Sequence, residues 1–283
     1  MKINHRIYRN IKKSNQAAAG IVVAVLMLGL FFTMYALVQG VYVPQWMETK
    51  EAEHMDQVAN QFAELKSSVD MLTVMQQPYS SVTNPITLGS REMPFLASNR
   101  AYGNLAILPT ECEIIIEDNV TSVSYTLGSI KYSSQNAYYL DQSYIYENGA
   151  VILSQSKDDL IIIKPNFLVT NDNDFIFNLI KISDIGGIST ASGYKTYPLQ
   201  TRYSGGEQIN IHYVRNLTVI SPYKDAWEKF FTNILSTDDF DYIVEDTTDG
   251  DGIVVRFSEY TDYPIIDIKL HEIEAQISPG WTE

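Results

Sequence analysis

Histidines are the first residues to test for chemistry, because histidine serves both as a general base and as a metal ligand. Of the four in the chain, His271 opens the segment HEIEA (271–275), which matches half of the zinc-protease motif H-E-x-x-H. Position 275 is alanine, so the second ligand is missing, and the segment alternates like a strand rather than a helix. His5, His54 and His212 are scattered along the chain. The sequence predicts no zinc centre.

Closely spaced carboxylates offer a second kind of chemistry, the binding of a hard cation through oxygen ligands. Asp249 and Asp251, within EDTTDGDG (245–252), are spaced like the first ligands of a calcium loop. The EF-hand order fails, because Gly252 falls at the fourth loop position and no glutamate closes the loop. The turn is therefore a weak candidate for an external cation site, and a solvated turn is the alternative.

The motifs of nucleophilic and phosphate-binding chemistry do not occur in the sequence. It has no G-x-S-x-G elbow, no G-x-x-x-x-G-K-S/T loop and no G-x-G-x-x-G fingerprint. The single cysteine, Cys112, lies among acidic residues in ECEIIIED, where no nearby base lowers the pKa of its thiol. We expect it to be a small buried residue at the start of a strand. The sequence predicts neither catalytic residues nor a bound cofactor.

Two N-x-S/T sequons are candidate sites of N-glycosylation. They begin at Asn119 and Asn216, and both are acceptor sites if the segment is exported by an organism that glycosylates asparagine. Asn216 lies in the middle of a predicted strand, so its side chain must point to solvent for the prediction to hold.

Charge is distributed very unevenly along the chain. Residues 1–16 hold five bases and no acid, and residues 17–47 hold no charged residue. Residues 48–283 hold the other 15 bases and all 34 acids, a formal charge of −19. Such a surface repels nucleic acid and anionic lipid, so we expect no nucleic-acid partner.

The segment 17–43, AAAGIVVAVLMLGLFFTMYALVQGVYV, is long enough to cross a bilayer, for which about 20 apolar residues suffice. Bases before it and the acidic METKEAE after it predict that residues 1–16 form a cytoplasmic basic stub and that residues 48–283 are extracellular. Tyr35, Tyr42 and Trp46 lie toward the outer end of the run, where aromatic rings favour the interface. The alternative is a secretory signal cleaved near Gly40, but the run exceeds the usual apolar region of a signal, about 7–15 residues. We therefore expect a retained single-pass anchor in the cell membrane.

An amphipathic helix is predicted directly after the anchor, over residues 44–76. Its apolar residues recur at spacings of three and four, the pattern of a helix with one buried face, and they are Met55, Val58, Phe62, Leu65, Val69 and Leu72. Pro44 cannot donate a hydrogen bond to the carbonyl of Gly40, which predicts a kink at 40–44. We expect the six residues, hereafter the stripe, to pack against the rest of the chain. A short parallel coiled coil is the alternative.

From Tyr79 to the C-terminus the pattern changes to short apolar or alternating runs separated by Asn, Asp, Gly and Pro, which is typical of antiparallel β structure. Asn148-Gly149 is a strong hairpin signal, because both residues tolerate positive φ. One more helix is predicted near 223–235, where Trp227, Phe230 and Phe231 share a face. The expected fold class is α+β: a long N-terminal helix kinked near Pro44 and packed on a β-sandwich-like external body over 79–283.

This plan resembles type IV pilins and pilin-like proteins. The segments EAEHMDQVANQFAELKSSVD, PITLGSREMPFLASNRAYGNLAI, YIYENGAVI, GGISTASGYKTYPLQTRYSGG and SPYKDAWEKFF are similar to a family of archaeal pilin-like surface proteins. The resemblance implies a filament subunit or a filament-associated subunit, with other pilin-like subunits as partners. Two features differ from pilins. Ser14, Asn15 and Gln16 separate the bases from the apolar run, and the glutamate common near the mature start of many pilins is absent.

The function that the sequence favours is therefore a non-enzymatic, membrane-anchored surface protein with a structural or adhesive role. A single anchored subunit that does not polymerise is also consistent with these two differences. The alternative function is a membrane-tethered ligand-binding module or enzyme, which would need a pocket of convergent polar groups.

Overall fold

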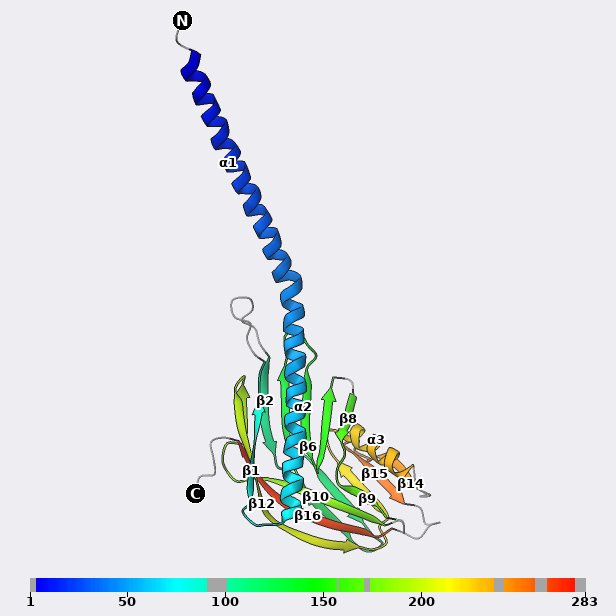
Figure 1. Ribbon diagram of the computed structural model, residues 1–283. Coiled ribbons are helices and arrows are strands. Elements are labelled where there is room, and N and C mark those ends of the chain that lie inside the picture. The colour runs from blue at the N-terminus through cyan, green and yellow to red at the C-terminus, as the bar shows by residue number, and fades with distance from the viewer. Residues whose placement is uncertain are drawn as a thin grey trace.

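The computed structural model describes residues 4–90, 101–156, 158–170, 174–236, 242–257 and 264–277, with residues 4–18 as backbone only. The side chains of the basic stub at 1–16 therefore lie outside the described residues. The fold is α+β, as the sequence predicts: one long N-terminal helix, a mostly antiparallel β body and one further short helix. Figure 1 shows the first half of the long helix projecting alone and the second half lying along the body.

The long helix bends at the predicted position and continues through it. It consists of α1 (Asn4–Leu37), a π-helical turn η1 (Val38–Tyr42) and α2 (Val43–Met75). In the π register the backbone N–H of Val43 donates to the carbonyl of Val38, so the turn that precedes Pro44 is widened. The missing N–H of Pro44 is thereby accommodated without ending the helix. Figure 1 shows the helix changing direction between α1 and α2.

The first sheet has the strand order β1-β12-β16-β10-β9. Its strands are β1 (Ser81–Thr87), β9 (Phe167–Val169), β10 (Phe175–Asp184), β12 (Thr196–Ile211) and β16 (Ile266–Ile277). All neighbours in this sheet are antiparallel except β10 and β16, which are parallel.

The second sheet is antiparallel throughout, with the order β11-β2-β5-β6-β7-β8. Its strands are β2 (Tyr102–Leu108), β5 (Ser129–Gln135), β6 (Gln142–Glu147), β7 (Ala150–Gln155), β8 (Asp158–Ile163) and β11 (Thr190–Gly193). Asn148 and Gly149 form the predicted tight turn between β6 and β7, with φ of 45° and 74°.

The third sheet is also antiparallel, with the order β14-β15-β13-β3-β4. Its strands are β3 (Glu113–Glu117), β4 (Ser122–Thr126), β13 (Asn216–Ile220), β14 (Tyr242–Asp246) and β15 (Gly252–Phe257). The short helix α3 (Lys224–Leu235) falls where the sequence predicts a helix, and it contacts β13, β14 and β15 as well as β8.

Two hydrophobic cores replace the single core of a simple sandwich. One core contains α3 and the third sheet, and the other contains α2 with strands of the first and second sheets. Strand β10 serves both, because Phe175, Phe177 and Leu179 belong to the first core whereas Ile180 and Ile182 belong to the second. Successive side chains of a strand point to opposite faces of the sheet. One face of β10 therefore packs in the first core up to Leu179, and the opposite face packs in the second core from Ile180 onward. The first sheet therefore joins the two cores.

Candidate functional site

The stripe on α2 lies in the second core. Its six residues are Met55, Val58, Phe62, Leu65, Val69 and Leu72, and each is no more than 1% exposed. α2 contacts β1 and β12 of the first sheet and β6 and β7 of the second. The ring of Phe62 lies 6.1 Å from that of Tyr144 on β6. The stripe is thus buried by contacts within the chain, so none of its residues is exposed to form a coiled-coil seam.

A buried carboxylate fixes α2 to the body near the start of the helix. Glu51 is fully buried, and its two oxygens accept hydrogen bonds from three successive backbone N–H groups of the β5–β6 loop. The distances are 3.1 Å to the nitrogen of Ala137 and 2.7 Å to those of Tyr138 and Tyr139. Hydrogen bonds to an ionised acceptor are stronger than neutral ones. Glu51 therefore sets the height of the loop along the helix, a role that the sequence did not reveal.

One helical turn from Glu51, His54 belongs to a buried hydrogen-bond chain. His54 Nε2 lies 3.0 Å from the hydroxyl of Tyr132, and that hydroxyl donates to the carbonyl of Leu88 at 3.0 Å. Since the Tyr132 proton is used on Leu88, its oxygen accepts from His54, which places a proton on Nε2. Burial lowers the pKa of His54, opposed by the Leu88 carbonyl and by the charge of Glu51. His54 thus links α2, β5 and the end of β1 in its neutral form.

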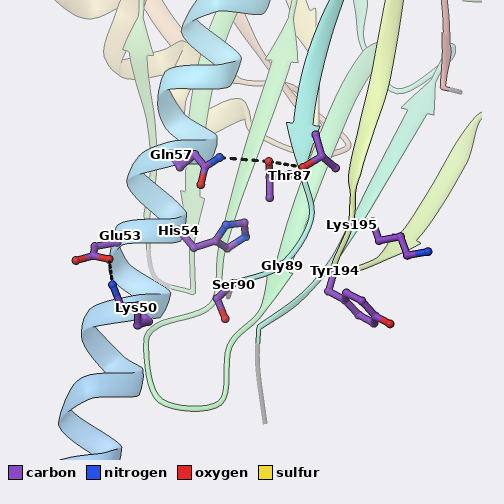
Figure 2. A pocket seen from close by; sticks show the side chains of 10 residues that line it. Lys50, Glu53, His54, Gln57, Thr87, Gly89, Ser90, Tyr194 and Lys195 are labelled. Carbon is purple, nitrogen blue, oxygen red and sulfur yellow. Dashed lines mark hydrogen bonds and ion pairs between the residues drawn. The ribbon is translucent and has the colours of Figure 1, made fainter. Parts of the chain in front are cut away.

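Beside these residues a cleft of about 630 Å³ opens between α2, the end of β1 and the β11–β12 turn (Figure 2). It is lined by Lys50, Glu53, His54, Gln57, Thr87, Gly89, Ser90, Tyr194, Lys195 and Thr196. Figure 2 shows Lys50 turned toward Glu53, with which it forms an ion pair of 2.6 Å, and Tyr194 and Lys195 pointing away from the helix.

Close backbone packing shapes the floor of this cleft. A Cβ atom on Gly89 would lie 2.4 Å from the carbonyl oxygen of Ala101 and 2.7 Å from Cα of Tyr194. Such distances are too short for any side chain, so glycine is required at position 89, where the backbone passes close to Ala101 and Tyr194.

The cleft is lined mainly by polar side chains, which are not arranged as a nucleophile and base. The imidazole of His54 is paired with a tyrosine hydroxyl, and the hydroxyl of Ser90 accepts the backbone N–H of Ala101 at 2.9 Å. Both groups are therefore engaged in holding the walls together. The arrangement favours structure or binding over acyl transfer.

A second buried carboxylate lies in the other core, at the end of β6. Glu147 is fully buried, and its Oε1 accepts hydrogen bonds from the indole of Trp227 at 2.7 Å and from Ser221 at 2.8 Å, whereas Oε2 has no hydrogen-bond partner. Desolvation raises the pKa of Glu147 to about 7, against the opposing effect of these two donors and of the Cys112 thiol. The nearby charge of Glu111 raises it further. The buried thiol of Cys112 lies beside it with its pKa well above the usual value, mainly through burial.

The sequence carries one signal for a special role of Glu147. Glu147 is the last residue of β6, directly before the Asn148-Gly149 turn. It lies on the same face of the strand as Ile145, which is buried in the first core, so an acid occupies a position where an apolar residue is expected. Its partners Trp227 and Ser221 are distant in sequence, and no local pattern could have supplied them.

The candidate cation turn is closed by its own hydrogen bonds. Asp251 accepts from the hydroxyl of Thr247 at 2.9 Å, and Thr247 in turn accepts the backbone N–H of Gly252. Asp249 and Asp251 are both exposed at the β14–β15 turn. Within the described ranges, no three His, Cys, Asp or Glu side chains are grouped so that they could hold a metal ion. His271 lies in strand β16, as its alternation indicates, and is buried.

The two sequons differ in exposure. Asn119 is exposed at the β3–β4 turn, which Asp118 closes by accepting the backbone N–H groups of Val120 and Thr121. Asn216 is half-buried on β13, a strand with neighbours on both sides, and its amide donates to Glu117 at 2.7 Å. Only Asn119 therefore presents an unobstructed side chain to a modifying enzyme in the folded protein.

Comparison of the chain with protein-family models, curated proteins and solved structures finds no match. The described residues contain one helix long and apolar enough to cross a membrane, at the N-terminal end.

Proposed function

We propose that this chain is a membrane-anchored, outward-facing pilin-like surface protein with a structural or adhesive role. The observation that supports the proposal most is the contrast between the two halves of one continuous helix. Between Ile21 and Leu37 every large apolar side chain is more than half exposed, whereas the apolar stripe of α2 is buried. Such a long apolar surface requires a nonpolar environment, and a bilayer around residues 17–43 supplies one. The apolar helices of other pilin-like subunits in a filament would supply another.

The proposed orientation rests on charge. Five bases precede the apolar run and the acids follow it, so the positive-inside rule places the N-terminus in the cytoplasm. The acidic body would then face outward, where its negative charge favours solubility.

Labelling of an introduced cysteine in intact cells tests the orientation. Val120 is 89% exposed at the β3–β4 turn, so the variant Val120→Cys presents a reactive thiol there. The unsubstituted chain, whose only cysteine is buried, is the matched control. We expect a membrane-impermeant maleimide to label Val120→Cys in intact cells and to leave the control unlabelled. Labelling only after lysis would place the body inside and refute the proposal.

Mass spectrometry of the native protein tests the relation to filaments. Cleavage just before the apolar run, together with recovery of the chain in filaments sheared from the surface, would support a filament subunit. An intact N-terminus in the membrane fraction would support a single anchored subunit. A mature N-terminus near Val41 would mean that the apolar run is a removed signal, which would refute the anchor.

The second candidate function is a membrane-tethered ligand-binding module, which the polar cleft beside His54 favours. Titration of the solubilised chain with glucose as a neutral probe and inorganic phosphate as an anionic probe tests it. A saturable rise in melting temperature, reduced by Thr87→Val on the wall of the cleft, would favour this function.

A further inference from the structure

The β body begins where the apolar run ends. Val43 is the last residue of that run and, among the described residues of the long helix, it is the first that is buried, at 3% exposure. Met47, one turn further, is completely buried. No stalk therefore separates the apolar helix from the body, and Figure 1 shows the body starting beside the beginning of α2. Any bilayer crossed by the apolar run must therefore come close to the edge of the β body that lies beside the start of α2.

Among the described residues of the β body, four exposed apolar or aromatic residues lie on the edge beside the start of α2, and we call them the rim: Tyr102, Tyr138, Leu140 and Tyr194. Their exposed fractions are 45%, 38%, 63% and 45%. They come from three segments that are distant in sequence, at the start of β2, in the β5–β6 loop and in the β11–β12 turn.

Contacts with the helix fix the height of the rim. Glu51 holds the backbone of Tyr138, and the carbonyl of Leu140 accepts the amide of Asn136 in the same loop. Tyr102 pairs with Gln135, the residue at which that loop begins. Tyr194 lines the cleft together with Lys50 on the helix.

The height along the helix places the rim near the bilayer surface. Glu51 lies eight residues beyond Val43, a rise of about 12 Å at 1.5 Å per residue. The headgroup layer on one side of a bilayer, about 5–8 Å thick, and an extended tyrosine side chain together cover this distance.

The composition of the rim suits the water–lipid interface. Tyrosine has an apolar ring and a polar hydroxyl, which is why it is enriched at headgroup level. Tyr42 and Trp46 are also exposed aromatic residues, and their ring centroids lie 5.9 Å apart. They lie on the helix near the end of the apolar run, before Glu51. Charged residues of both signs adjoin the rim, with Asp141 next to Leu140 and Lys195 next to Tyr194, whereas residues 48–283 as a whole have a formal charge of −19. A contact through aromatic insertion avoids the repulsion that this charge would cause at an anionic surface.

We propose that the rim lies in the headgroup layer of the bilayer that the apolar helix crosses, so that the body rests on the membrane. The rim is then a second membrane contact, made by the β body. This inference rests on the proposed function, because it requires residues 17–43 to lie in lipid.

Depth measurement with spin labels on the full chain in vesicles of neutral phosphatidylcholine tests the proposal. Single cysteines at Leu140 and Tyr194 report the rim, and Leu30→Cys reports the apolar helix. Val74→Cys, at an 82% exposed position at the far end of α2, is the matched water-exposed control. The buried Cys112 takes up no label, which the unsubstituted chain verifies. Nickel chelated to lipid headgroups shortens the relaxation time of a label that lies in the headgroup layer.

We expect headgroup nickel to shorten relaxation at positions 140 and 194 and to leave it unchanged at position 74. Oxygen, which concentrates in hydrocarbon, should act most strongly at position 30. If position 30 senses hydrocarbon but 140 and 194 behave like 74, the anchor stands and the rim proposal is wrong. If position 30 does not sense hydrocarbon, the proposed anchor itself fails. Spin–spin broadening at position 140 that disappears on dilution with unlabelled chain would assign the rim to a second copy and also overturn the proposal.

Discussion

Glu51 on the helix and Tyr138 in the β5–β6 loop are joined by a hydrogen bond of 2.7 Å from the loop backbone to the buried carboxylate. The same carboxylate accepts the N–H groups of Ala137 and Tyr139. The position of the β5–β6 loop along the helix thus depends on a single side chain of α2.

The variant Glu51→Ala should destabilise the body strongly. It leaves three part-buried backbone donors without their acceptor. Hydrogen bonds to a charged group contribute about 1.5–3 kcal/mol, and water can reach part of the loop backbone, so a loss of about 2–3 kcal/mol in the free energy of unfolding is expected. Urea unfolding of the solubilised chain measures it. Glu53→Gln, at an exposed position two residues away on the same helix, is the control and should leave the curve unchanged. Equal curves for the two variants would show that the carboxylate does not hold the loop.

Phe62 in the centre of the stripe should be intolerant of charge. Phe62→Asp places an unpaired carboxylate in the second core, and several kcal/mol of stability should be lost. Phe62→Ala, which leaves a cavity, should cost about 3–5 kcal/mol. Val74→Asp is the matched control on the same helix, since Val74 is 82% exposed. An unchanged melting curve for Phe62→Asp would mean that the stripe does not pack within the chain.

Tyr132 should matter through its hydroxyl group alone. Tyr132→Phe keeps the buried ring but removes the acceptor for His54 and the donor for the carbonyl of Leu88. Because both partners are buried, the free energy of unfolding should fall by about 2 kcal/mol. Tyr138→Phe, which removes an exposed hydroxyl, should have no effect on the unfolding midpoint. Indistinguishable midpoints for the two variants would contradict the role of the hydrogen-bond chain.

The fold class and the helix positions could be predicted because they depend on local periodicity. The stripe repeats at helical spacing, and the Asn148-Gly149 turn has the φ values that these residue types allow. The kink at Pro44 was predicted from its missing N–H, but the π-helical turn that accommodates it depends on how the neighbouring helical segments are held. The sequence therefore predicts the position of a bend in a helix more readily than the backbone geometry of that bend.

The two buried carboxylates could not be predicted, because their partners are distant in sequence. Glu51 follows an apolar run, where an acid is expected to mark membrane orientation and face water. Its partners begin 86 residues later, at Ala137. The presence of three sheets instead of a sandwich also escaped prediction. The change of phase at Leu179 and Ile180 is visible in the sequence, but it gains meaning only when a second core is known to cover the other face.

Glu147 should make stability depend on pH in the direction opposite to an ordinary ion-paired acid. Burial raises its pKa to about 7 in the folded protein, from an ordinary value of 4.5. Between these two values the folded state binds more protons than the unfolded state, so the free energy of unfolding falls as pH rises through this window and levels off above pH 7. The difference corresponds to about 3 kcal/mol. Below pH 6.5 His54 and His271 act in the opposite sense, because burial lowers their pKa.

The variant Glu147→Gln isolates this contribution. The amide oxygen can still accept from Trp227 and Ser221, and an unpaired amide N–H costs the same at every pH. Chemical unfolding measured from pH 4.5 to 8 should therefore show the unsubstituted chain losing stability relative to Glu147→Gln as pH rises. Glu245→Gln, at an exposed ion pair with Arg256, is the control and should retain the slope of the unsubstituted chain. Parallel curves for the unsubstituted chain and Glu147→Gln would show that Glu147 does not titrate in this window. The Trp227 and Ser221 donors would then keep the buried carboxylate charged, which would require a pKa in the folded state close to the ordinary value.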